Sequence, residues 1–217
     1  PEKIYKTLYY DLEPGQRAIY EVAEKQLRYE RESGDIDKYT ALTKVTKLQQ
    51  IVSGFIKTAD GLQSVSKGNP RLALLKDTIE DLEGQFIIWA IYRHEIEQIA
   101  ALLSDLGIQT VEYHGGVAEK DRELAIDTFQ SGQARAFLGH AQAAGIGLTL
   151  TNASTAIYYS CGYSLELRLQ SEDRCHRIGT KHSVVYIDLA AMDTIDEKIV
   201  AALQAKSDVA AAIVNGL

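Results

Sequence analysis

Cysteine, proline and long apolar runs are all scarce in this 217-residue sequence, which contains 2 Cys and 3 Pro. The spacing of Cys161 and Cys175 from His176 and His182 fits no common zinc module, so we expect reduced, partly buried thiols and no metal site. No apolar run approaches the roughly 20 residues that a membrane span needs, so no membrane partner is expected. The first residues, P-E-K-I-Y-K, lack signal-peptide architecture, which predicts a cytoplasmic chain, or a nuclear one in a nucleated cell. Pro1 in place of Met suggests a processed or excised piece.

Positive charge is also in short supply. The net charge is −7, with 23 Lys plus Arg against 30 Asp plus Glu, which argues against a protein that binds nucleic acid over its whole surface. The excess is uneven, because residues 1–68 carry 11 basic and 10 acidic side chains while residues 69–217 carry 12 and 20. Any contact with DNA is therefore expected in a local groove of backbone amides, hydroxyls and a few cations.

The first third of the chain predicts one strand and two helices. Residues 3–12 alternate loosely, as a strand does, before the turn signal E-P-G. Apolar positions at helical spacing predict a helix over residues 16–33 and a second one that ends at Val52. We expect the two helices to form a hairpin whose apolar stripe is core, followed by a glycine-containing loop over residues 53–69.

After Pro70 strands and helices alternate. Strands are predicted at residues 85–92, 110–113, 134–138, 156–160 and 184–189, and helices at residues 72–82, 95–106, 119–129 and 165–178. A closing helix begins with a predicted capping box, Thr194-x-x-Glu197. Repeated units of this length predict an α/β fold with a parallel sheet and helices on both faces. The expected domains are a strand with a helical protrusion and linker at residues 1–69, and an α/β domain at residues 70–217.

The most informative segment is Q-S-E-D-R-C-H-R-I-G at residues 170–179. On a helix, Gln170, Arg174 and Arg177 would share one face. Two guanidinium groups one turn apart present planar donors that match phosphate oxygens, so the pair is a candidate clamp for a triphosphate; the alternative is a solvated face of mixed charge. The order of the letters resembles motif VI of superfamily 2 helicases, and most of all Swi/Snf-type DNA translocases in a viral or bacterial form.

The resemblance covers nearly the whole chain, and the motifs follow the order of that family. F-I-I-W-A-I-Y-R-H resembles motif IV, Y-H-G-G resembles the glycine motif that follows it, and F-L-G-H-A-Q-A-A-G-I-G-L-T-L-T resembles motif V. E-P-G-Q-R-x-x-Y and K-L-Q-Q-I-V-S-G resemble the helical protrusion between the two motor lobes. Without the resemblance, the glycine pair would be an ordinary turn and the motif V segment an ordinary strand-to-helix loop. Gln142 departs from the family pattern, in which a basic residue is frequent.

The resemblance implies a RecA-like lobe and a role for each motif. Arg174 and Arg177 would reach the γ-phosphate of ATP, with Arg177 as the arginine finger proper. Gln170 would orient one arginine or touch motif V, and Asp173 would hold an arginine beside the nucleotide. His176 is expected to be a core histidine. Nucleotide contacts are further implied for Gly145 and Gly147, and DNA contacts for Tyr92, Arg93, His114, Gly115, Gly116, Gln142 and Thr149.

Two motifs needed for ATP hydrolysis are missing from the sequence: a G-x-x-x-x-G-K-[ST] phosphate loop and a D-E-x-H-type box. ATP and Mg²⁺ would therefore be bound mainly by an N-terminal RecA-like lobe of the same protein. The hypothesis is the second lobe of an ATP-dependent translocase on double-stranded DNA, inactive alone. The alternative is a standalone nucleic-acid-binding or regulatory module. A dinucleotide enzyme is disfavoured, because Gly145 and Gly147 lack the third glycine of that motif.

Overall fold

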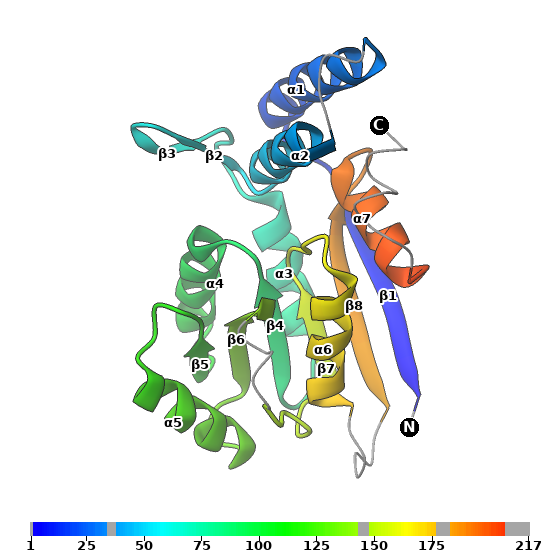
Figure 1. Cartoon of the computed structure of the whole chain (residues 1–217). Coiled ribbons are helices and arrows are strands. Elements are labelled where there is room, and N and C mark those ends of the chain that lie inside the picture. Colours follow the sequence, from blue (N-terminus) through cyan, green and yellow to red (C-terminus); the bar gives the residue numbers. More distant parts are fainter. Residues whose placement is uncertain (1, 34–37, 143–147, 177–182, 207–217) are drawn as a thin grey trace. The chain divides into compact units, whose positions relative to one another are not determined.

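The computed structural model describes residues 2–33, 38–142, 148–176 and 183–206 (Figure 1). In this part of the chain no helix combines the length and apolarity required to cross a bilayer.

Six strands form one sheet in the order β1-β8-β7-β4-β6-β5. β4 pairs in parallel with both β6 and β7, and the pairs β5/β6 and β7/β8 are parallel as well. β1 lies at the edge beside β8, where the Val184 N–H donates to the Glu2 carbonyl oxygen at 3.2 Å. The predicted α/β fold with a parallel sheet is confirmed. The strands are β1 (Lys3–Tyr10), β4 (Phe86–Ala90), β5 (Thr110–Tyr113), β6 (Ala136–His140), β7 (Thr155–Tyr158) and β8 (Val184–Ala191).

Helices lie on both faces of this sheet. Figure 1 shows α6 (Leu165–Cys175) in front of the strands and α3 (Pro70–Glu80) behind them, while α4 (Arg93–Asp105) and α5 (Glu119–Gln130) follow β4 and β5. The Ser164 hydroxyl accepts the Leu167 N–H at 3.2 Å and so caps the first turn of α6. This local cap fixes the start of α6 at Leu165, the residue expected from the sequence.

The centre of the sheet is buried on both faces. All five residues of β4 and all four of β7 are buried, as expected of parallel strands covered by helices. The Phe137 ring packs edge-on against Trp89 and Phe129 and is stacked on Tyr113. This core fixes the strand ends from which the candidate site loops leave.

The chain divides into two compact units, residues 1–8 with 74–189 and residues 9–73 with 190–217. β1, expected in the N-terminal segment, is thus a strand of the large sheet. In the second unit α1 packs along α2 as the predicted helical hairpin, and α7 also packs on α2. The stripe of α1 is core only in part, because Ile19 and Val22, expected to be buried, are exposed. The domain boundary between residues 69 and 70 stays a prediction. The elements of the second unit are α1 (Pro14–Glu32), α2 (Lys38–Val52), β2 (Phe55–Thr58), β3 (Gly61–Ser64) and α7 (Ile195–Gln204).

A buried arginine holds the second unit together. The Arg71 side chain, 2% exposed, donates from Nε to the Tyr10 hydroxyl at 2.6 Å and from Nη2 to the Asp196 carboxylate at 2.5 Å. Nη1 lies 3.3 Å from the Ser53 hydroxyl oxygen. Burying this charge is tolerable because each of these nitrogens has an oxygen partner.

Three expectations about local structure were wrong. The segment at residues 53–69 is not only a loop, because β2 and β3 form an antiparallel hairpin with Thr58 opposite Gly61. Its strands of four residues are too short to give a clear period-two pattern, and Gly61 has a positive φ of 116°. α6 ends at Cys175 rather than at residue 178, since the cap residue His176 has an extended backbone.

The third difference concerns the start of α7. Thr194 is the N-cap as predicted, and its hydroxyl accepts the Asp196 N–H at 3.2 Å. The Glu197 carboxylate, however, accepts the N–H of Asp193 at 3.1 Å. The reciprocal bond of the predicted capping box is thus shifted by one residue, because Asp193 adopts a positive φ of 53° just before the helix.

Candidate functional site

The loops predicted to carry function meet at one edge of the sheet. β7, β4, β6 and β5 are neighbours in that order and run in parallel, so their carboxyl ends share an edge. Tyr92 and Arg93 follow β4, His114 to Gly116 follow β5, and Gln142 follows β6. Ligands of open parallel sheets bind at this edge. The topology therefore brings three of the sequence motifs together.

Arg93 lies directly over the glycine turn after β5. A Cβ built on Gly116 would stand 1.9 Å from the Arg93 Nη1 atom and 2.7 Å from its Cζ atom, so only a glycine fits beneath this guanidinium as it stands. The same guanidinium bonds Glu97 on the surface at 3.2 Å and remains 61% exposed. Gly115 has no heavy atom within 4 Å of such a Cβ. The turn thus combines an exposed cation with an open stretch of backbone.

His114 shapes this turn from within. The ring is buried, and its Nδ1 atom accepts the Gly116 N–H at 3.0 Å. The proton of the neutral ring is then on Nε2, which donates to the Glu112 carboxylate at 3.1 Å. Both ring nitrogens are thus bonded within the strand end and the turn, so the imidazole stabilises the backbone conformation of the turn.

His140 plays the equivalent role after β6, and the sequence reasoning missed it. Its Nδ1 atom accepts the Gln142 N–H at 3.2 Å, which leaves Nε2 to donate to the Ile91 carbonyl oxygen at 2.9 Å. The ring thereby joins the ends of β4 and β6. It holds the start of the motif V loop, where Gln142 is exposed. The candidates Gly145 and Gly147 lie outside the described residues.

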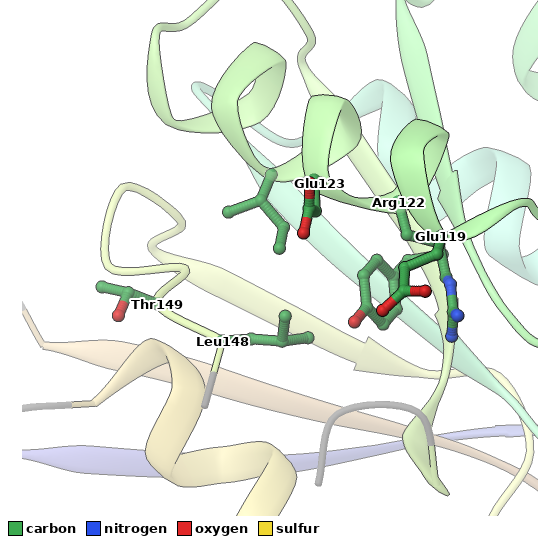
Figure 2. Close-up of a pocket in the computed structure, with 7 residues that line it drawn as sticks. Glu119, Arg122, Glu123, Leu148 and Thr149 are labelled. Atoms are coloured by element: carbon green, nitrogen blue, oxygen red, sulfur yellow. The ribbon is translucent and has the colours of Figure 1, made fainter. Parts of the chain in front are cut away.

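A pocket of about 450 Å³ opens between α5 and the segment that follows the motif V loop (Figure 2). Thr149 lines it as the one predicted contact residue. The Arg122 guanidinium lies over the Tyr113 ring at 5.8 Å, and its buried Nε has no hydrogen-bond partner within the described ranges. Because Glu119 and Glu123 also line the pocket, an anion would meet two carboxylates there. The pocket therefore presents mixed charge, one guanidinium and two carboxylates.

The motif VI helix presents Gln170 and Arg174, whereas Arg177 lies outside the described residues. The Gln170 amide donates to Glu166 at 3.0 Å on the exposed side of α6. Arg174 is half-buried, and its Nε is buried without a hydrogen-bond partner in the described part of the chain. Its carbonyl oxygen accepts the Leu150 N–H at 2.9 Å, which ties motif VI to the end of motif V.

The expected partner of Asp173 is different in the structure. Its carboxylate is 65% exposed and bonds Lys3 of β1 at 3.0 Å, whereas an arginine had been expected. His176 is half-buried rather than a core residue, and it caps the end of α6. The partner of Asp173 differs because β1 joins the sheet next to β8, which no local signal around residue 173 reveals.

The cysteines near this helix differ in environment. Burial raises the pKa of the Cys175 thiol to about 12, and the negative charge of Glu172 adds to the effect. Cys161 is half-buried and within 3.5 Å of Asp188. Within the described ranges no three His, Cys, Asp or Glu residues are grouped as metal ligands would be.

Comparison with known proteins adds an independent line of observation. Residues 70–179 match the family model described as the helicase conserved C-terminal domain. An uncharacterized ATP-dependent helicase of Mycoplasma pneumoniae is 26% identical over 202 residues, which cover 92% of this chain and 19% of that protein. The chain thus spans about a fifth of the length of this curated relative.

Solved structures share the fold. The Sulfolobus solfataricus SWI2/SNF2 ATPase core in complex with dsDNA superposes with a TM-score of 0.74 at 24% identity, over 95% of this chain and 44% of that one. The C-terminal part of the Fun30 ATPase domain superposes with a TM-score of 0.71 at 18% identity, over 93% and 88% of the two chains.

Proposed function

The chain belongs to the family of helicase conserved C-terminal domains and has the fold of the C-terminal lobe of Swi2/Snf2 ATPases, and from this premise we propose that it is the second lobe of an ATP-dependent DNA translocase. In this proposal the lobe supplies arginine side chains to a nucleotide held elsewhere and contacts the DNA backbone with its carboxyl-edge loops. It does not hydrolyse ATP alone.

Arg174 carries the proposal. A buried guanidinium Nε without a partner costs on the order of 1–3 kcal/mol, and a group of this kind is expected where a ligand completes the bonding. A guanidinium cannot lose its proton at any working pH, so Arg174 brings a permanent positive charge to the last turn of α6, next to the end of motif V. An arginine that neutralises a transferring phosphoryl group contributes roughly three to five powers of ten in rate. We assign this role to Arg174 and Arg177, with Gln170 orienting one of them.

ATP with Mg²⁺ supplies the phosphoryl group and the charge that these arginines neutralise. The sequence holds no phosphate loop, so a first RecA-like lobe of the same protein is proposed to bind the triphosphate. Gly145, Gly147 and Asp173 are proposed to lie near that nucleotide. The bond between Leu150 and the Arg174 carbonyl oxygen gives a direct path from the nucleotide arginines to motif V.

DNA is proposed to bind along the loops at the carboxyl edge. Arg93 offers an exposed guanidinium to a phosphate, and the Gly115 and Gly116 backbone lets a strand approach closely. Gln142 and Thr149 extend this surface along motif V, and Tyr92 lies beside Arg93. With one strongly exposed cation at its centre, the surface suits local backbone contact on duplex DNA, with hydrolysis stimulated by DNA and little strand separation.

The test is steady-state ATP hydrolysis with and without duplex DNA, using the isolated chain and the complete gene product. The isolated chain should show no turnover, and the complete protein should be stimulated by DNA. In the complete protein, Arg174→Ala and Arg177→Ala should each lower kcat by at least about a hundredfold with a similar KM for ATP. Arg135→Ala is the matched control and should change kcat less than twofold, because the Arg135 guanidinium donates to the carbonyl oxygens of Leu82 and Gly84 and is not part of motif V or VI. Turnover that survives both arginine changes would refute the proposal and favour a module that only binds nucleic acid.

A further inference from the structure

Arg168 is a second arginine of α6, six residues before Arg174, and its guanidinium points to Asp188 of the sheet. It is 6% exposed, which is unusual for a side chain that keeps its charge at any working pH. We propose that Arg168 is a positioning residue, whose buried guanidinium fixes the rotation of α6 on the sheet and thereby aims Arg174 at the phosphate. This inference rests on the proposed function and deepens it.

The planar Arg168 guanidinium donates hydrogen bonds to two carboxylates. Nη1 and Nη2 donate to the two oxygens of Asp188 at 2.5 and 3.2 Å, and Nε donates to Glu172 at 2.9 Å. Asp188 is on β8 and Glu172 is one turn further along α6. The two bonds to Asp188 leave one rigid plane and fix both the distance and the rotation of the helix relative to β8, which a single point charge does not. The bond to Glu172 holds that plane in position on α6.

A third contact reaches the next strand. The Arg168 guanidinium carbon lies 3.5 Å from the centre of the Tyr158 ring on β7. The Tyr158 hydroxyl bonds the Ser171 hydroxyl at 2.7 Å, and Ser171 is itself on α6. A cation over an aromatic face is stabilised most when both are shielded from water, as they are here. α6 is therefore attached to two neighbouring strands through directional contacts.

Glu172 connects α6 to β1 as well. Its second carboxylate oxygen accepts the Tyr5 hydroxyl at 2.7 Å and the Lys3 ammonium at 3.2 Å. Its carbonyl oxygen accepts the Tyr186 hydroxyl at 2.9 Å. Because Glu172 precedes Arg174 by two residues, all of these bonds act at the turn from which the catalytic arginine leaves the helix.

The composition of α6 explains why such bonds matter. Its buried residues are Arg168, Ser171, Glu172 and Cys175, so polar groups rather than a leucine stripe face the sheet. An apolar stripe tolerates small rotations at little cost, because the hydrophobic effect is not directional. Ion pairs with fixed geometry do not, which is why buried polar groups can specify one arrangement.

The experiment is steady-state hydrolysis by the complete gene product with duplex DNA. Arg168→Lys keeps the charge but removes the fork, and kcat should fall about tenfold to a hundredfold with KM for ATP within about twofold, as expected when a catalytic group is misplaced by an ångström. The matched control is Arg71→Lys. Arg71 is also buried, bonds Asp196 and lies over the Tyr10 ring, but it belongs to the other unit. The kcat of Arg71→Lys should therefore change less than about twofold.

A double mutant separates positioning from mere stability. If Arg168 acts through Arg174, adding Arg168→Lys to Arg174→Ala should lower kcat no further. The proposal would be overturned if Arg168→Lys lowered kcat no more than Arg71→Lys does. It would also be overturned if the losses in kcat from Arg168→Lys and Arg174→Ala multiplied in the double mutant. If the Arg168→Lys variant unfolds below the assay temperature, Asp188→Asn is used in its place, and the same changes in kcat and KM are expected. If Arg174→Ala itself leaves kcat unchanged, the proposed function fails instead, and the two failures are thus distinguished.

Discussion

The Leu150 N–H donates to the Arg174 carbonyl oxygen at 2.9 Å, so the segment after the glycine-rich loop is bonded directly to the last turn of α6. A main-chain bond of this kind moves both partners together. Under the proposed function, a shift of either motif on binding nucleotide or DNA would be passed to the other through this main-chain bond.

Arg174→Met should abolish DNA-stimulated hydrolysis in the complete protein and leave the fold as stable as before, or more stable by about 1 kcal/mol. The reason is that methionine fills similar space and removes the buried, unpaired Nε. Urea unfolding of the isolated chain measures the stability. Arg168→Met is the contrast and should cost about 3–5 kcal/mol, because it leaves Asp188 buried and without its guanidinium partner. Equal losses for the two variants would contradict the assigned roles.

Gly116→Ala should weaken duplex DNA binding about threefold to tenfold at low salt, since the new Cβ displaces the Arg93 guanidinium. Fluorescence anisotropy with a labelled duplex measures the affinity. Gly115→Ala is the matched control, because open space surrounds that position. Adding Arg93→Ala to Gly116→Ala should cause no loss beyond that of Arg93→Ala alone. Additive losses would show that the glycine acts independently of the arginine.

His114→Ala should destabilise the chain by about 1–3 kcal/mol, because the Gly116 N–H loses its buried acceptor. Equilibrium urea denaturation followed by circular dichroism measures this difference. The half-exposed His94 offers a control, and His94→Ala should cost less than about 0.5 kcal/mol. If DNA affinity fell after His114→Ala while stability did not, the imidazole would be a contact residue and not a part of the turn.

Alkaline pH should destabilise the fold through Cys175, whose pKa is raised by burial to about 12. In the unfolded chain the thiol ionises near its ordinary pKa of about 8.5, so the unfolded state releases its proton first as pH rises. This group's contribution to stability is complete below about pH 8.5 and declines by about 1.4 kcal/mol per pH unit above it, until the folded thiol also ionises.

Urea midpoints between pH 8 and 11 for the wild type and for Cys175→Ala measure this effect. The variant should lose stability less steeply, although buried tyrosines such as Tyr158, whose pKa is also raised by burial, act in the same direction. If stability fell equally steeply with pH in the wild type and in Cys175→Ala, the pKa of the Cys175 thiol would not be raised by folding. Cys161→Ala is the control, because that thiol is only half-buried.

Local pattern was sufficient for most elements. Thr110–Tyr113 is a strand as predicted, and α1 and α4 begin and end within two residues of their expected positions. The hairpin of β2 and β3 was not predicted, because strands of four residues are too short to show a period-two pattern. The order of the motifs also led to the family, since each motif is a contiguous run of residues.

The sequence by itself determined the α/β class, the parallel sheet and the candidate loops, because apolar periodicity, caps and turn residues act over a few neighbouring positions. Only the tertiary structure decided which side chains meet. Lys3 bonds Glu172 across 169 positions of the chain, and Arg168 meets Asp188 through a strand pairing that no local signal encodes. Two arginines of one helix therefore differ in their surroundings, because the sheet places Asp188 beside Arg168 and leaves the buried Nε of Arg174 without a hydrogen-bond partner among the described residues.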